Sequence, residues 1–265
     1  MRTPQPSDPV VVSMPFEGGD VFYTDTGSGP CVLALHGCPG SVRDWRWLGS
    51  PIEAKARLIR IDLPGFGKTP LSTFPSASFS DRAAWVVRFM SALGIDEFVV
   101  MGHSAGGPLA MEIAAAFPDT VKGLALIAAP GFRPHRPLRE HPVPRLMSGM
   151  LRIPGLRWAV LPWIRWGFER AGFPKGIALE SIRQSIHIVV ELDFDRQISN
   201  AELMQCPCLV AWSDDDTFID SDISQELARG CPPGPRLNFI DGTHYIQKTQ
   251  SMEIAASLCE WLEIL

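Results

Sequence analysis

The 265-residue sequence has no long hydrophobic run. A membrane-spanning helix needs about 20 consecutive apolar residues, and every stretch of that length here contains a charge, a proline or a glycine. The first residues, MRTPQPSDPVVVSMP, also lack the apolar segment of a secretory signal. We therefore expect neither a transmembrane nor a secreted protein, and membrane association is not expected.

Positive charge is also scarce. The chain has 24 Lys and Arg against 29 Asp and Glu, a formal net charge of -5. Nucleic-acid-binding domains are usually basic, so no nucleic-acid partner is expected.

The six cysteines show none of the spacings typical of metal sites or redox pairs. They are Cys31, Cys38, Cys206, Cys208, Cys231 and Cys259. There is no CxxC pair and no His/Cys ligand spacing. The pattern predicts reduced thiols, a cytoplasmic protein and no metal or organic cofactor.

Short buried strands and helices alternate through the first half of the chain. A hydrophobic fraction of 46% is enough for a large core. The expected strands are 10–12, 21–23, 31–35, 58–63, 98–101 and 121–128, and the expected helices are 81–93 and 104–117. This alternation predicts an α/β fold, with helices on both faces of a mostly parallel sheet.

The alternation stops at residues 131–200, which are rich in proline, arginine and tryptophan. This segment carries eleven basic and six acidic residues, a net charge of +5 that leaves -10 on the rest. Such a shift in composition indicates a separate module. Strands at 207–212 and 236–240 and helices at 221–228 and 249–265 then resume the pattern, so residues 1–130 and 201–265 are expected to form one core.

The most informative motif is Gly102-His103-Ser104-Ala105-Gly106, which matches G-x-S-x-G. It lies between an expected strand and an expected helix, the setting in which this motif holds a nucleophilic serine on a sharp turn. The N-terminus of the following helix favours developing negative charge. We therefore expect Ser104 to be a nucleophile.

A serine hydroxyl needs a base, and the base needs a group that orients it. Asp214, Asp215 and Asp216 follow the expected strand 207–212, and His244 follows the strand 236–240. Both loops lie at carboxyl ends of strands, where an open α/β sheet gathers its active site. His244 is the expected base, and one of the three aspartates is the expected acid.

Two backbone N–H groups are expected to bind the oxyanion. One belongs to Ala105, directly after the nucleophile, and the other to Cys38 in the loop His36-Gly37-Cys38-Pro39-Gly40. In this role Cys38 contributes its N–H and not its thiol.

Taken together, the motifs resemble those of the α/β-hydrolase superfamily, in the group with a helical cap after the sixth strand. They are HGCPG at 36–40, DLPGFG at 62–67, GHSAGG at 102–107, the aspartate loop at 213–217 and DGTH at 241–244. The resemblance implies an eight-stranded, mostly parallel sheet with residues 131–200 as the cap. Aligned with the G-x-x-D-P pattern of the family, Asp216 becomes the acid, although Ser213 and Thr217 depart from that pattern.

The cap is expected to choose the substrate. Trp163 and Trp166 are candidates for an apolar substrate pocket, with packing of the cap onto the core as the alternative interpretation. The positive charge of the cap can complement the acidic core, or it can attract anionic substrates.

These observations predict a serine hydrolase that cleaves a carboxylic ester of a small apolar substrate through an acyl-enzyme, using Ser104, Asp216 and His244. Family relatives with an HGxPG loop include epoxide hydrolases and dehalogenases, which have an aspartate nucleophile, so Ser104 argues against those activities. Hydrolysis of a carbon–carbon bond or a thioester, or perhydrolysis, remains open on the same residues. A ligand-binding receptor or non-catalytic homologue is the alternative from a different class.

Overall fold

An eight-stranded sheet forms the centre of the molecule, in the order β1-β2-β4-β3-β5-β6-β7-β8. The computed structural model describes residues 5–74, 76, 78–139, 143–151, 153–170 and 175–265. The strands are β1 (Val12–Phe16), β2 (Gly19–Thr26), β3 (Cys31–Leu35), β4 (Arg57–Ile61), β5 (Phe98–His103), β6 (Val121–Ile127), β7 (Cys208–Ser213) and β8 (Arg236–Phe239). Pairings from β4 through β8 are parallel, whereas β2 is antiparallel to both β1 and β4.

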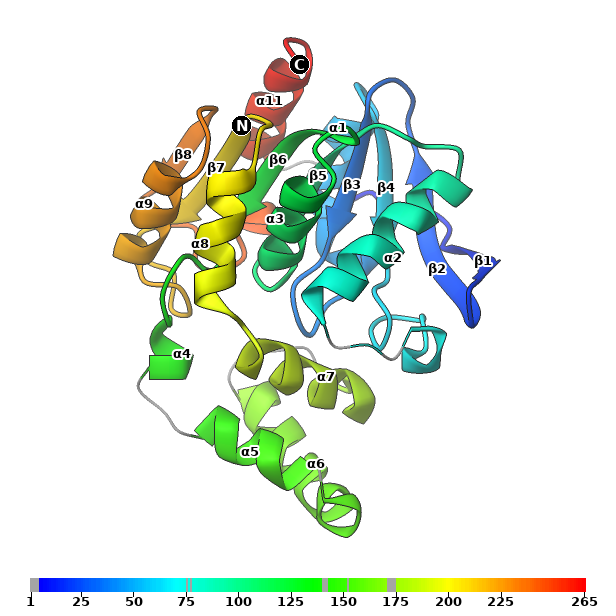
Figure 1. Cartoon of the computed structure of the whole chain (residues 1–265), viewed down its shortest axis with the longest axis vertical. Coiled ribbons are helices and arrows are strands. Elements are labelled where there is room, and N and C mark those ends of the chain that lie inside the picture. Colours follow the sequence, from blue (N-terminus) through cyan, green and yellow to red (C-terminus); the bar gives the residue numbers. More distant parts are fainter. Residues whose placement is uncertain (1–4, 75, 77, 140–142, 152, 171–174) are drawn as a thin grey trace.

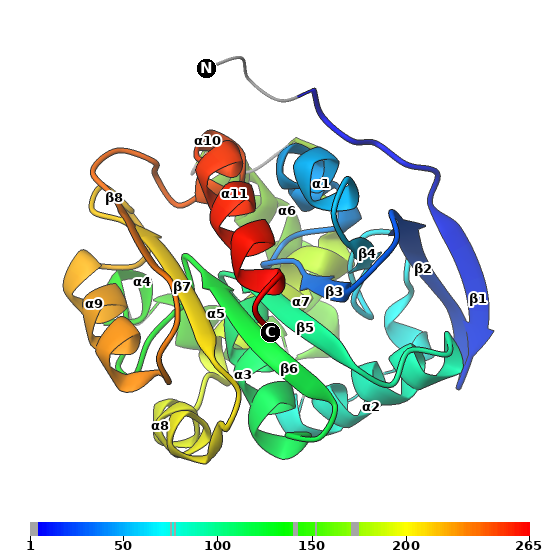
Figure 2. The same cartoon turned by 90° about the horizontal axis from the view of Figure 1, so that it is seen from above.

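Helices cover both faces of the sheet, as Figure 2 shows. One face carries α1 (Arg46–Glu53), α10 (Ile246–Thr249) and α11 (Ser251–Leu262). The other carries α2 (Phe79–Ala92), α3 (Gly106–Ala116), α8 (Phe194–Leu203) and α9 (Ser221–Gly230). Each face has its own cluster of buried apolar side chains. Strands β5 and β7 are buried along their whole length, which explains their nearly continuous apolar sequences.

Helix α2 begins slightly earlier than the sequence predicts. Ser78 is its N-cap, and the hydroxyl of Ser78 accepts a hydrogen bond from the N–H of Asp81. Asp81, at which the expected helix begins, lies in the first turn, where its negative charge still favours the helix. Gly94 follows the helix with φ of 72°, a backbone conformation that favours glycine.

Between β6 and β7 the chain leaves the sheet and forms a group of helices below the core in Figure 1. They are α4 (Arg136–Arg139), α5 (Val143–Leu151), α6 (Pro154–Arg170) and α7 (Leu179–Val190). Leu151, Leu161, Ile164, Ile182 and Ile186 form their common apolar core. None of the described helices is long and apolar enough to cross a membrane.

The returning helix α8 packs against α3, the helix that follows Ser104. Its Arg196 and Asn200 donate hydrogen bonds to the buried carboxylate of Glu112 on α3, and Ser80 on α2 adds another. Burial by itself would raise the pKa of Glu112, but these donors outweigh it and hold the pKa below its usual value. The cluster therefore fixes the end of the cap to the layer that supports Ser104.

Candidate active site

Ser104 sits on the sharp turn between β5 and α3 with a φ of 49°, which is rare for a residue other than glycine. The two flanking glycines are required by close contacts. A Cβ at Gly102 would collide with the backbone of Gly106, and a Cβ at Gly106 would collide with the carbonyls of Leu35 and His36. The turn thus holds the serine in strained geometry at the carboxyl end of the strand.

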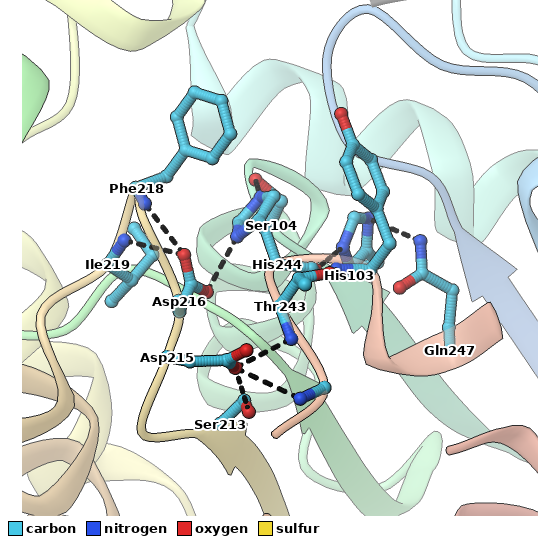
Figure 3. Close-up of polar contacts among 12 residues, drawn as sticks. His103, Ser104, Ser213, Asp215, Asp216, Phe218, Ile219, Thr243, His244 and Gln247 are labelled. Atoms are coloured by element: carbon cyan, nitrogen blue, oxygen red, sulfur yellow. Dashed lines mark hydrogen bonds and ion pairs between the residues drawn. The ribbon is translucent and has the colours of Figure 1, made fainter. Parts of the chain in front are cut away.

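Figure 3 shows the chain of hydrogen bonds that reaches this serine from β7 and β8. Nε2 of His244 is 2.8 Å from Oγ of Ser104, and Nδ1 of His244 is 2.8 Å from Oδ2 of Asp216. An ionised carboxylate only accepts hydrogen bonds. The ring proton therefore lies on Nδ1, and Nε2 is left to accept the proton of Ser104.

The structure separates the three consecutive aspartates. Oδ1 of Asp216 accepts the N–H groups of Phe218 and Ile219, at 2.7 and 3.0 Å, while its Oδ2 faces His244. The structure thus brings Asp216 to the base, where the sequence pattern places the acid. Its neighbour Asp214 bonds to Ser221 instead.

Asp215 holds the turn that carries the histidine. Its Oδ1 accepts the N–H groups of Gly242 and Thr243, at 2.9 and 2.7 Å, and the hydroxyl of Ser213 at 2.6 Å. The bonds from Ser213, Gly242 and Thr243 lower the pKa of Asp215. In the sequence, only its place in the run of three aspartates points to Asp215, as one of the candidates for the acid.

His103 is a second residue near the base that sequence analysis did not single out. Its Nε2 is 3.0 Å from the carbonyl oxygen of His244, and its Nδ1 is 3.3 Å from the amide nitrogen of Gln247. Burial, with a contribution from His244, lowers the pKa of His103 to about 3. The neutral ring therefore holds the backbone of His244, yet it occupies a variable position of G-x-S-x-G and has no sequence signature.

The loop 36–40 lies directly against the serine. The position of a Cβ on Gly37 is 3.1 Å from Cβ of Ser104. Among the described residues, the N–H groups of Cys38 and Ala105 donate no hydrogen bond. Cys38 and Ala105, the expected oxyanion donors, line the same cavity as Ser104.

Two motif residues hold this loop in place. Oδ1 of Asp62 accepts the N–H of Val42, and its Oδ2 accepts the N–H of Lys68. Nε2 of His36 accepts the N–H of Leu63 at 3.1 Å. The DLPGFG and HGCPG motifs therefore support each other. Burial raises the pKa of the Cys38 thiol to about 12, so this thiol is not a nucleophile at neutral pH.

A cavity of about 750 Å³ opens onto Ser104 and His244. Its cap side is lined by Met147, Gly167, Phe168, Ser185, Ile186, Val189 and Leu192. Trp163 and Trp166 were expected to form the substrate pocket, but they are 75% and 57% exposed on α6. Neither is among the described residues that line the cavity, so the expected pocket role is corrected to an exposed position.

The carboxyl group of Asp44 is an unexpected feature of the cavity wall. It lies against the loop 36–40, because a Cβ at Gly40 would collide with Oδ2 of Asp44. Burial raises the pKa of Asp44 to about 7, with a smaller contribution from Asp62. Asp44 therefore changes charge near neutral pH beside the expected oxyanion site.

The described residues contain no cluster of three or more His, Cys, Asp or Glu side chains that could hold a metal ion. All six cysteines are free thiols.

Known proteins share this organisation. The family model described as the alpha/beta hydrolase fold matches residues 30–154. A haloalkane dehalogenase of Mesorhizobium japonicum is 26% identical over 98% of this chain and 94% of its own. A 2-hydroxy-6-oxononadienedioate/2-hydroxy-6-oxononatrienedioate hydrolase of Paraburkholderia phymatum is 27% identical over 82% of each chain.

One relative is much longer than the matched region. The dihydrolipoyllysine-residue acetyltransferase component of the acetoin cleaving system of Cupriavidus necator is 32% identical over 44% of this chain, but the match spans only 31% of the relative.

Solved structures agree over nearly the whole chain. A haloalkane dehalogenase of Bradyrhizobium elkani has a TM-score of 0.77 at 21% identity, covering 96% of this chain and 97% of its own. A thermophilic esterase of Thermogutta terrifontis has a TM-score of 0.74 at 21% identity, covering 97% and 98%. With its sheet order, its serine turn and its match to the family model over residues 30–154, the chain has the α/β-hydrolase fold.

Proposed function

We propose that this protein is a serine hydrolase that cleaves a carboxylic ester of a small, largely apolar substrate. The observation that carries the proposal is the chain of two 2.8 Å contacts that links Ser104 to His244 and His244 to Asp216. Such a chain turns a weak hydroxyl nucleophile into a reactive one. The cavity of about 750 Å³ above it has the size of a small-molecule site.

The reaction proceeds in two steps. Ser104 attacks the acyl carbonyl while His244 takes its proton, and the oxyanion binds the N–H groups of Cys38 and Ala105. His244 then gives the proton to the leaving alcohol, and an acyl-enzyme remains. Water, deprotonated by His244, attacks this ester and releases the acid and free Ser104.

The identity of the nucleophile separates this chemistry from dehalogenation. Displacement of a halide by a carboxylate gives an ester intermediate, which water hydrolyses at its carbonyl. Displacement by Ser104 would give an alkyl ether, which has no carbonyl for water to attack. Similarity to a haloalkane dehalogenase therefore supports the scaffold and not that reaction.

Hydrolysis of a carbon–carbon bond is the second candidate. It is favoured by the relative from Paraburkholderia phymatum, which matches 82% of this chain. The same acyl-enzyme would form, but the leaving group would be a carbanion that needs protonation. Comparing an ester with a diketone of similar size distinguishes the two activities.

The test of the proposal is Ser104→Ala. Wild type is expected to react with a fluorophosphonate probe and to show a burst of nitrophenol from 4-nitrophenyl butyrate. The variant is expected to lose labelling and nearly all turnover, by a factor of about 10⁶ if the residues act as a unit. Ser199→Ala, an exposed serine on α8, is the matched control.

Two results would count against the proposal. Labelling of Ser104→Ala at the wild-type rate would show that another residue is the nucleophile. Wild type that neither labels nor turns over any ester would favour the receptor alternative.

A further inference from the structure

His135 is a buried histidine in the catalytic cavity that the proposed reaction does not use. It lies between β6 and α4, at the entrance to the cap, and only 6% of its surface is exposed. Its side chain lines the same cavity as Ser104 and His244. Burial is the main cause that lowers the pKa of His135, and the nearby charges of His244 and Asp216 act on it as well.

The ring of His135 lacks hydrogen-bond partners within the described part of the chain. Its Nδ1 is inaccessible to solvent and has no partner, so a ligand in the cavity can meet the ring only at Nε2. His103 provides the contrast, since both of its ring nitrogens have partners. His135 is therefore not explained as a structural link of the same kind.

An imidazole in this position is costly to the fold. Burial lowers the pKa of His135 to about 4, so the ring is neutral at pH 7 and offers one N–H donor and one lone pair. Leaving buried polar groups unsatisfied destabilises a protein. The apolar residues of this cavity, among them Pro130, Met147, Phe168 and Ile186, offer the ring no hydrogen bond.

We propose that Nε2 of His135 binds the substrate through a hydrogen bond to a hydroxyl or carbonyl group, so that the preferred substrate is an otherwise apolar ester carrying one such polar group. The inference rests on the proposed ester hydrolysis and specifies its substrate class. A site built to hydrogen-bond one substrate group discriminates strongly against the analogue that lacks it, because its own polar atoms then stay unpaired. His135 therefore acts on substrate choice, and Ser104 and His244 perform the chemistry.

The test compares esters that differ by one polar group. The panel contains 4-nitrophenyl hexanoate and its analogues with one hydroxyl or oxo group at C3, C4 or C5, and hexyl acetate with the same groups on the alcohol. At least one substituted ester is expected to be preferred by wild type. His135→Leu is expected to lower that preference, as a ratio of kcat/KM values, by about 10-fold, whereas His135→Gln retains part of it.

Three controls separate the explanations. His187→Leu, on α7 outside this cavity, is expected to leave the ratio unchanged. His135→Leu is expected to raise Tm, since it removes an unsatisfied polar group, whereas a purely structural histidine would lower Tm when replaced. If the leucine variant does not fold, His135→Met provides the same comparison.

Dissociation constants in the Ser104→Ala background add a readout that needs no turnover, and they are expected to show the same selectivity. Turnover of unsubstituted hexanoate by wild type tests the proposed function by itself. If the leucine variant changes substituted and unsubstituted esters by one common factor, His135 does not recognise a substrate polar group and the inference is overturned.

Discussion

The position of His244 depends on two adjacent carboxylates with different tasks. Asp216 contacts the ring at 2.8 Å, so it sets the tautomer and stabilises the charge that forms during proton transfer. Asp215 contacts the backbone N–H groups of Gly242 and Thr243, so it fixes the turn that presents the ring. One controls the electrostatics of the base and the other its location.

Replacing each aspartate by asparagine should separate these tasks. Asp216→Asn is expected to lower kcat by up to ~10⁴, because it leaves the imidazole in the wrong tautomer. Asp215→Asn is expected to lower Tm as well as kcat, with a smaller effect on kcat, because it loosens the turn. Asp214→Asn serves as the control and should resemble wild type in kcat. If Asp216→Asn kept full activity, Asp216 would not be the acid that orients His244.

Asp44 predicts a pH effect of its own. Its pKa is raised to about 7, so the carboxyl is neutral below pH 7 and negative above it. A negative charge beside the loop 36–40 opposes the oxyanion, so kcat/KM is expected to fall as pH rises through 7. In Asp44→Asn this decline should disappear, while Asp20→Asn, at an exposed position, should keep it. Profiles of kcat/KM between pH 6 and 9 test this expectation.

The raised pKa of Asp44 should also make the free energy of unfolding depend on pH. An unfolded aspartate loses its proton near pH 4, whereas folded Asp44 keeps it to about pH 7. Between these values the folded state binds more protons, so the free energy of unfolding falls as pH rises. Asp44→Asn should remove this contribution, and an unchanged pH slope of stability would contradict the assignment.

The sequence identifies some residues of the site but not those whose role depends on partners far away in the chain. Ser104 and His244 could be located because a glycine motif and a strand end mark them. Asp215, His103 and His135 could not, because their significance comes from partners, or missing partners, elsewhere in the chain. His103 contacts His244 across 141 positions, for example. No local pattern encodes such a contact.

At the scale of elements, α6 explains why the tryptophans do not line the cavity. Leu161, Ile164 and Phe168 follow helical spacing and pack toward α5 and α7. Trp163 and Trp166 fall between these positions and are turned outward. The number of apolar residues in the cap indicated a pocket, but their helical spacing decides which side chains face inward.

The preferred acyl length should therefore depend on the lining residues and not on the tryptophans. Met147→Ala and Ile186→Ala enlarge the cavity and are expected to shift preference from butyrate to octanoate esters, with acetate turnover retained, because only remote binding changes. Trp163→Ala is the matched control and should leave the profile of kcat/KM against chain length unchanged. A shift in the tryptophan variant alone would show that the exposed face of α6 contacts the substrate.

For the whole molecule, the alternation of strands and helices predicted the class of fold, and the motifs predicted its eight strands. The local sequence could not supply the sheet order, because β3 pairs with both β4 and β5 through contacts distant in the chain.

The opposite charges of the cap and the core meet in ion pairs between the two. Arg133 pairs with Asp222 and Glu226 on α9, and Arg136 pairs with Asp220.

These ion pairs predict how salt acts on the molecule. The Arg133→Gln/Arg136→Gln double variant is expected to unfold at a lower temperature than wild type, by a few degrees at low salt, since it removes the ion pairs that join cap and core. The difference should become smaller in 1 M NaCl, because salt weakens the attraction between solvent-exposed charges. Arg165→Gln, which removes a cap arginine with no ion pair among the described residues, is the control and should match wild type. If the double variant instead keeps its Tm and loses kcat/KM only for an anionic ester, the positive charge of the cap attracts substrate and does not anchor the cap to the core.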